Sequence, residues 1–239
     1  MIPVYVVTGL LGSGKTTLIN LELRERKKLG STEIISFETG NTEFIKSPLS
    51  IEPDDIEENL SRVVQQIQDY ISSTTPKEIW VEWNGMFSFQ QLERIFFSSI
   101  LKEFCHLERV IYTAKSNSIT SMIQALGDRI VSQLYSADYI MLYASDTTQT
   151  KAVKKLLQSY NPECSILINP TAKDIHNRLS QPLWPWSLYG IVAILTLYIL
   201  LVTVFRHSIS YSIHQVLAIA SGIIFEGIPF LLLGTIISS

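Results

Sequence analysis

The sequence predicts an α/β fold, a mainly parallel sheet flanked by helices, followed by two transmembrane helices. Short apolar, β-branched runs alternate with helix-length segments through the first 170 residues, which is the pattern of right-handed β–α–β crossovers. Charge is unevenly distributed along the chain. In residues 186–239 the only Asp, Glu, Lys, Arg or His side chains are Arg206, Glu226 and two histidines. We therefore expect a globular domain at 1–170, a linker at 171–186 and a membrane segment at 187–239.

The first half of the domain begins with an apolar strand at 2–8, and a helix at 15–29 follows a glycine-rich turn. A second strand is expected at 33–38. Pro53 then begins a helix that reaches residue 71, because apolar residues recur there at helical spacing. The apolar run 79–81, which ends at Glu82, is the third strand.

The second half continues the alternation. We expect a helix at 87–100, a strand at 109–114 and a helical region at 118–135 that is interrupted near Gly127. A fifth strand at 139–143, a helix at 147–160 and a sixth strand at 165–169 complete the domain. Because each pair of strands is separated by a helix, the six strands are expected to be mainly parallel.

The turn after the first strand is a complete phosphate-binding loop, or P-loop, placed directly before a helix. Its residues are Gly9, Leu10, Leu11, Gly12, Ser13, Gly14, Lys15 and Thr16, and Thr17 follows them. Glycines allow successive backbone N–H groups to point inward at one polyanion, and the helix N-terminus adds partial positive charge. Lys15 is expected to bridge the β- and γ-phosphates, and the Thr16 hydroxyl to bind Mg²⁺. The sequence thus predicts a P-loop NTPase fold that binds a nucleoside triphosphate.

Two glutamates end strands at the carboxyl edge of the sheet, where ligands bind in such folds. Glu82 is followed by Trp83-Asn84-Gly85, and we expect it to hold Mg²⁺ through water or to position the attacking water. The alternative is a solvated glutamate with no role in chemistry. Glu38 is a second candidate for contact with Mg²⁺ or for sensing the γ-phosphate. With Lys15, Glu82 is the predicted catalytic residue.

The P-loop resembles the GFLGAGKTT loop of the CobW-type GTPases, a branch that also includes the UreG and HypB proteins. Glu38 and Gly40 fall where that family has its NEFG stretch, and 82–85 is similar to its E-x-x-G element. Residues 136–140 resemble its A-D-x-I strand, and 161–166 resemble its N-P-x-A-x-I segment. The resemblance covers about 1–170 and implies Mg²⁺-dependent binding and hydrolysis of GTP.

Three departures from the family pattern limit this expectation. The guanine-reading N-K-x-D motif falls at 143–146, which reads Tyr-Ala-Ser-Asp, so only Asp146 is left to read the base and ATP stays possible. The C-x-C-C metal motif is absent, since residues 41–61 contain neither cysteine nor histidine. Thr113-Ala114 replaces the aspartate of the V-D-A strand end, which predicts weak intrinsic hydrolysis.

Two apolar stretches predict membrane spans at about 187–205 and 216–237, the second interrupted by Glu226 and Pro229. Residues 224–234 resemble the E-x-x-P-F-L-L-L-G stretch near the start of the YraQ-type predicted permeases. An acid at membrane depth is costly unless it faces protein or water, so Glu226 is expected inside a bundle or at a break between half-helices. The lipid bilayer is thus a predicted partner, with the nucleotide domain on the cytoplasmic side of the cell (inner) membrane.

The sequence therefore predicts a membrane-tethered, Mg²⁺-dependent GTPase that powers or regulates a metal- or small-solute permease. One alternative is a nucleotide sensor that does not hydrolyse its ligand. Another is a fragment of a permease subunit in which the P-loop domain is ancillary. A net charge of −3 and the lack of a basic tract indicate that nucleic acid is not a partner.

Overall fold

The computed structural model describes the 239-residue chain except for residues 26–30, 39–42, 181–185, 206–217, 219–220 and 223–239. The chain divides into two compact units, Met1–Gln181 and Pro182–Ser239. Each unit is described by itself. The first contains the sheet and its helices.

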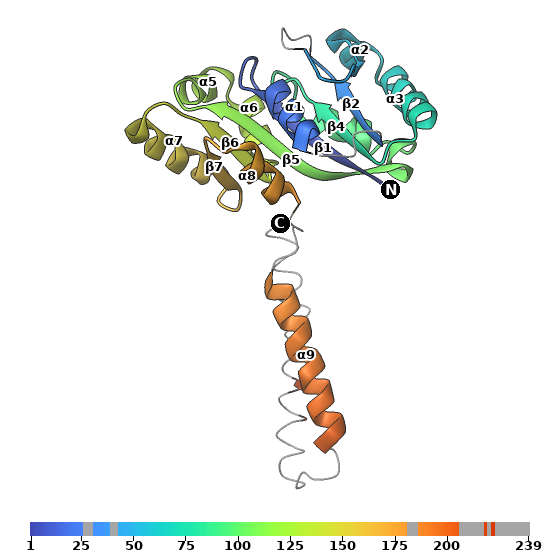
Figure 1. The fold of residues 1–239 in the computed structure, drawn as a ribbon, viewed down its shortest axis with the longest axis vertical. Coiled ribbons are helices and arrows are strands. Elements are labelled where there is room, and N and C mark those ends of the chain that lie inside the picture. The colour runs from blue at the N-terminus through green and yellow to red at the C-terminus, as the bar shows by residue number, and fades with distance from the viewer. Residues whose placement is uncertain (26–30, 39–42, 181–185, 206–217, 219–220, 223–239) are drawn as a thin grey trace. The chain divides into compact units, whose positions relative to one another are not determined.

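The first unit is built on one sheet with the strand order β3-β2-β4-β1-β5-β6-β7, and all neighbouring strands are parallel (Figure 1). Its strands are β1 (Ile2–Gly9), β2 (Thr32–Ser36), β3 (Leu49–Ser50), β4 (Glu78–Glu82), β5 (Cys105–Lys115), β6 (Tyr139–Tyr143) and β7 (Ser165–Ile168). This confirms the predicted parallel α/β fold. Six strands were expected, and β3 was missed because a two-residue strand has no apolar periodicity.

Most helices of the first unit lie between successive strands in the sequence, and the last helix follows the last strand. They are α1 (Lys15–Glu25), α2 (Pro53–Glu58), α3 (Leu60–Thr74), α4 (Phe89–Phe96), α5 (Ile119–Leu126), α6 (Asp128–Tyr135), α7 (Thr147–Tyr160) and α8 (Ala172–Leu179), with a 3₁₀ turn at Leu101–Glu103. The predicted interruption at Gly127 is confirmed, since this residue separates α5 from α6 with φ +50°. Such a φ favours glycine, which has no Cβ to clash with the backbone.

Alternate residues of each strand face opposite layers of helices, as the period of two in a strand requires. One face carries Tyr5, Val7 and Trp80, and packs against α1 and α8 (Figure 1). The other face packs against α3 and α4 at β1, β2 and β4, and against α5, α6 and α7 at β5 and β6. The sheet is therefore the buried middle layer of three, which explains why its strands read as nearly continuous apolar runs.

Two local differences from the predicted elements have clear causes. The helix expected from 53 to 71 breaks at Asn59, whose side chain accepts a hydrogen bond from Arg62 N at 3.2 Å and caps α3. The predicted linker at 171–186 contains α8, which begins with a capping box. Thr171 accepts from Asp174 N at 3.3 Å, and the Asp174 carboxylate accepts from Thr171 N at 3.0 Å.

The second unit contains α9 (Trp186–Phe205), whose side chains are described at 190–200. Across the described residues of both units, no helix combines the length and the apolar character that crossing a membrane requires. The second predicted span, at 216–237, lies almost entirely outside the described residues, which include only 218, 221 and 222 of it. The two transmembrane helices thus stay a prediction, whereas the parallel sheet is observed.

Candidate nucleotide-binding site

The P-loop connects β1 to α1 and is open on one side and tightly packed on the other. At Gly12, with φ +71°, an added Cβ would meet no atom within 4 Å, so this part of the loop borders open space. At Gly9, with φ +137°, an added Cβ would lie 2.3 Å from Thr113 O. The turn is closed by Ser13 N, which donates to Leu10 O at 3.1 Å. The loop is therefore a cradle whose first glycine is held against β5.

The cradle suits a phosphate chain because it ends at the N-terminus of α1, where the first backbone N–H groups have no partner within the helix. Leu11 projects its side chain outward and is 75% exposed, so it offers its backbone rather than its side chain. Thr17 lies exposed in the first turn of α1. Residues 9–17 thus form a glycine-rich loop and the first turn of a helix, and their binding of phosphate stays a prediction.

Lys15 is buried, and its ammonium group has three acceptors within hydrogen-bond distance. It donates to Gly9 O at 2.8 Å and to Leu10 O at 3.0 Å, and it forms an ion pair with Glu38 Oε2 at 2.7 Å. An ammonium group has three protons, so these contacts saturate it. A phosphate that reaches Lys15 must therefore displace the Glu38 carboxylate or share the lysine with it.

Thr16 and Glu82 meet beside this ion pair. Thr16 Oγ1 donates to Glu82 Oε1 at 2.5 Å, and Ser36 Oγ lies 2.9 Å from Glu82 Oε2. Burial raises the pKa of the Glu82 carboxyl above its ordinary value, while the two hydroxyl hydrogen bonds and the charge of Lys15 oppose this shift. Ser36 was not singled out from the sequence, because a serine inside a strand gives no distinctive signal.

The hydroxyl of Thr16 and the carboxylate of Glu82 are oxygen donors of the kind that Mg²⁺ prefers. Among the described residues, no group of three or more His, Cys, Asp or Glu side chains is arranged to hold a metal ion. The protein donors therefore fit a cation that takes its remaining ligands from phosphates and water, as Mg²⁺ does in nucleotide sites. Glu38 lies close enough to Glu82 for its charge to contribute to raising the Glu82 pKa.

Thr113 presents a hydroxyl on the β5 side of the loop. Its Oγ1 lies 2.6 Å from Ser13 Oγ and 3.2 Å from Thr8 O, to which it donates. Ser13 and Thr113 are both buried, so these neutral contacts are shielded from water. The Ser13 side chain is thus directed to β5 and not into the cradle.

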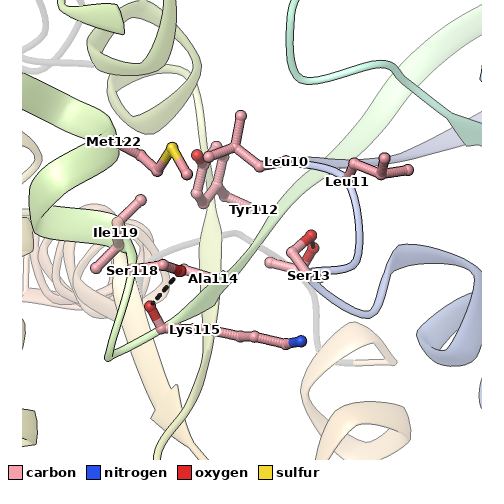
Figure 2. Close-up of a pocket in the computed structure, with 10 residues that line it drawn as sticks. Leu10, Leu11, Ser13, Tyr112, Ala114, Lys115, Ser118, Ile119 and Met122 are labelled. Carbon is pink, nitrogen blue, oxygen red and sulfur yellow. Dashed lines mark hydrogen bonds between the residues drawn. The ribbon is translucent and has the colours of Figure 1, made fainter. Parts of the chain in front are cut away.

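A small pocket of about 60 Å³ flanks the P-loop on its β5 side. It is lined by Leu10, Leu11, Ser13, Tyr112, Thr113, Ala114, Lys115, Ser118, Ile119 and Met122. In Figure 2 the Met122 side chain, from α5, points toward the P-loop, and Leu11 points away from the other lining residues. This volume is too small for a nucleotide, since sites for small molecules of that size measure hundreds of Å³. The pocket is a neighbour of the phosphate cradle and not the nucleotide site itself.

Tyr143 and Asp146 belong to the segment 143–146 that the sequence predicts to read the base. Tyr143 ends β6, and its ring lies 3.3 Å from the position of a Cβ on Gly14. Asp146 caps α7, because its Oδ1 accepts a hydrogen bond from Thr148 N at 2.8 Å. Asp146 therefore lies in the loop that follows β6, at the same edge of the sheet as the P-loop, with one carboxylate oxygen engaged by the helix.

Asn169 links the loops after β6 and β7 and was missed in the sequence. It accepts from Ala144 N at 2.8 Å and donates to Ala144 O at 2.7 Å, with φ +45°. An asparagine after a strand and before a proline is a signal for such a link, since asparagine tolerates this φ and bonds to backbone. These bonds hold the backbone beside Asp146.

Comparison with solved structures supports the fold. The Zn(II)-bound YjiA GTPase from E. coli matches with a TM-score of 0.52 at 20% identity, over 70% of this chain and 57% of that one. A Zn(II)-bound triple mutant of YjiA GTPase matches with a TM-score of 0.52 at 19% identity, over the same shares of the two chains. The chain thus spans little more than half the length of these relatives. At such identities the likeness shows the fold alone.

The remaining comparisons concern a further solved structure, the curated proteins and a family model. The hydrogenase maturation factor HypB from Archaeoglobus fulgidus matches with a TM-score of 0.44 at 11% identity, over 80% of this chain and 90% of that one. No curated protein matches the chain significantly. The family model described as CobW/HypB/UreG, nucleotide-binding domain, matches residues 3–167, which is well over half of the chain. The chain therefore belongs to the CobW/HypB/UreG family.

Proposed function

We propose that the first unit binds Mg²⁺–GTP and hydrolyses it slowly. The proposal rests on one observation, the convergence of Lys15, Thr16 and Glu82 beside the P-loop. Hydrolysis of a phosphoanhydride depends mainly on positioning and on electrostatic stabilisation, and these three side chains supply both. The preference for GTP over ATP rests on the family and on Asp146.

Each of the three side chains has a role that follows from its chemistry. Lys15 exchanges Glu38 for phosphate oxygen, because both are anionic acceptors that compete for the same ammonium protons. Thr16 would hold the cation by the hydroxyl that contacts Glu82, and Glu82 would accept a hydrogen bond from a cation-bound or attacking water. Bound Mg²⁺ would neutralise charge on the β- and γ-phosphate oxygens. The backbone N–H groups of α1 stabilise the remaining charge.

A second function, nucleotide sensing with negligible turnover, is favoured by two observations. Thr113 is neutral and is engaged by Ser13, so neither of these two side chains supplies a carboxylate that could organise water. Asp146 is engaged as the cap of α7, which reduces its availability for a base. A domain of this kind reports which nucleotide is bound through its conformation and not through product formation.

Nucleotide titration and single-turnover hydrolysis of the full chain distinguish these functions. We expect GTP to bind more tightly than ATP in the presence of Mg²⁺, and equal affinities would remove the guanine assignment. We expect hydrolysis to fall by about 100-fold in Glu82→Gln, as for removal of one transition-state contact. If the wild type hydrolyses GTP no faster than the uncatalysed reaction, its function is nucleotide sensing and not hydrolysis.

We further propose that the second unit tethers the domain to the lipid bilayer of the cell (inner) membrane, with the nucleotide site in the cytoplasm. Support comes from residues 187–205, which contain no charged side chain, and from the similarity of 224–234 to a permease stretch. Alkaline carbonate extraction tests the tether, because a spanning chain stays in the pellet. Release of the chain into the supernatant would contradict the proposal.

The proposal includes a partner, a permease for a metal ion or small solute to which the nucleotide domain is coupled. Nucleotide binding at Lys15 would control passage through that partner. The test compares accumulation of a panel of divalent ions by cells that produce the wild-type chain or Lys15→Ala at equal amounts. The same accumulation of every ion in both would argue against coupling to metal transport.

A further inference from the structure

Gln133 is a fully buried glutamine on α6 that makes three hydrogen bonds. Its Oε1 accepts from Thr8 Oγ1 at 2.7 Å. Its Nε2 donates to Gly85 O at 3.0 Å and to Phe87 O at 2.5 Å. Both amide donors and the amide oxygen are thus engaged, as a buried side-chain amide requires.

These partners belong to two segments of the nucleotide site. Thr8 is the residue before the first glycine of the P-loop. Gly85 and Phe87 lie in the turn that begins at Glu82, which contacts Thr16. One side chain from a helix outside the site therefore joins the two segments on which phosphate and cation binding depend.

The turn after Glu82 lies directly on the P-loop. An added Cβ on Gly85 would lie 2.3 Å from Gly9 O and 3.0 Å from Leu10 N, so the two backbones touch. Trp83 N donates to Val7 O at 2.9 Å, which holds the start of the turn against β1. The Gly85–Phe87 end is held by Gln133, because its two carbonyls both accept from this amide.

We infer that Gln133 is a positioning residue that holds the Gly85–Phe87 turn against the start of the P-loop and thereby favours binding of a nucleoside triphosphate over a diphosphate. This inference rests on the proposed function. The turn lies on the terminal-phosphate side of the site, since Glu82, from which it begins, contacts the hydroxyl predicted to bind Mg²⁺. A displaced turn weakens contacts with the terminal phosphate and leaves those of the diphosphate in place.

The test measures the affinities of full-length wild type and Gln133→Met for a non-hydrolysable GTP analogue and for GDP, both with Mg²⁺. Methionine has a similar volume and makes none of the three hydrogen bonds. We expect affinity for the analogue to fall by about tenfold, the effect of losing buried hydrogen bonds, and affinity for GDP to change less than about twofold. Equal losses for both nucleotides would mean a purely structural role and would overturn the inference.

Two further variants serve as controls. Leu134→Ala removes a buried side chain of the same helix, and we expect it to lower stability without changing the ratio of the two affinities. Thr8→Val removes one of the three bonds, and we expect the same direction as Gln133→Met with a smaller effect. If Gln133→Met does not fold, the inference is tested with Thr8→Val alone. An unchanged ratio of the affinities for the GTP analogue and GDP in Thr8→Val would then overturn the inference.

Hydrogen exchange of the nucleotide-free protein separates this inference from the proposed function. In Gln133→Met we expect faster amide exchange at 84–87 than in wild type, and no such change in Leu134→Ala. Unchanged exchange at 84–87 would overturn the positioning role whatever the wild type binds. Failure of the wild type to bind either nucleotide would instead refute the proposed function, and faster exchange would still support the positioning of the turn.

Discussion

Replacement of Glu38 by glutamine is expected to tighten nucleotide binding. The Glu38 carboxylate lies 2.7 Å from the Lys15 ammonium, and both groups are largely buried. Nucleotide binding must break or weaken this ion pair before Lys15 contacts phosphate. Glutamine keeps the size of the side chain but removes the negative charge that competes with phosphate.

The size of the effect follows from the bond that is lost. A hydrogen bond to a charged group contributes about 1.5–3 kcal/mol, so its loss from the nucleotide-free state should raise affinity by about 10- to 100-fold. Repulsion between Glu38 and a bound triphosphate disappears as well, and this acts in the same direction. The free energy of unfolding of the nucleotide-free protein should decrease, because Lys15 loses its buried counter-charge.

Calorimetric titration with GDP and with a non-hydrolysable GTP analogue measures this change. Glu57→Gln is the matched control, since it alters the net charge equally at an exposed position of α2. We expect its affinities to match the wild type. If Glu38 is instead a ligand of Mg²⁺, as the sequence also suggests, Glu38→Gln would bind Mg²⁺–nucleotide more weakly. That result would refute the competition between Glu38 and phosphate.

Three other changes have defined outcomes. Lys15→Ala should weaken nucleotide binding by about 100-fold or more in the same titration, while circular dichroism stays unchanged. Because burial raises the pKa of Glu82, the folded state retains a proton that the unfolded state releases between the ordinary and the raised pKa. The unfolding free energy in denaturant should therefore decrease as pH rises through that window. Glu82→Gln should weaken this dependence and leave the part due to Asp138, whose carboxyl pKa is also raised by burial. Gly85→Ala should destabilise the domain by about 1–3 kcal/mol in denaturant, because its Cβ would overlap Gly9 O; a stable, nucleotide-binding variant would contradict this close packing.

The elements with strong local signals were predictable from the sequence. Residues 139–143 and 147–160 form β6 and α7 as predicted, because a buried apolar run and a capped helix each define their own limits. The break at Gly127 was also predictable, since glycine commonly interrupts helices. Elements that depend on tertiary contacts could not be predicted from the sequence. The two-residue β3 exists only because it pairs with β2, and no periodicity of its own marks it.

The site was predictable where one segment carries the chemistry. The P-loop and Glu82 stand out because glycines, a lysine and a strand-end acid occur in a recognised order. The contact of Thr113 with Ser13 and the position of Gln133 could not be found in this way, since Ser13 lies 100 residues from Thr113 and Thr8 lies 125 residues from Gln133. Long-range hydrogen bonds leave no periodic trace in a sequence.

The packing of α1 against α8 joins the beginning of the first unit to its end. Leu18, Leu23, Ile175 and Leu179 lie in one buried cluster between these helices and the sheet, and His176 Nδ1 lies 3.3 Å from Glu22 Oε2. A close-packed interface of this kind transmits a displacement and does not absorb it. A displacement of α1 would therefore be passed on to α8, the last described helix of the first unit.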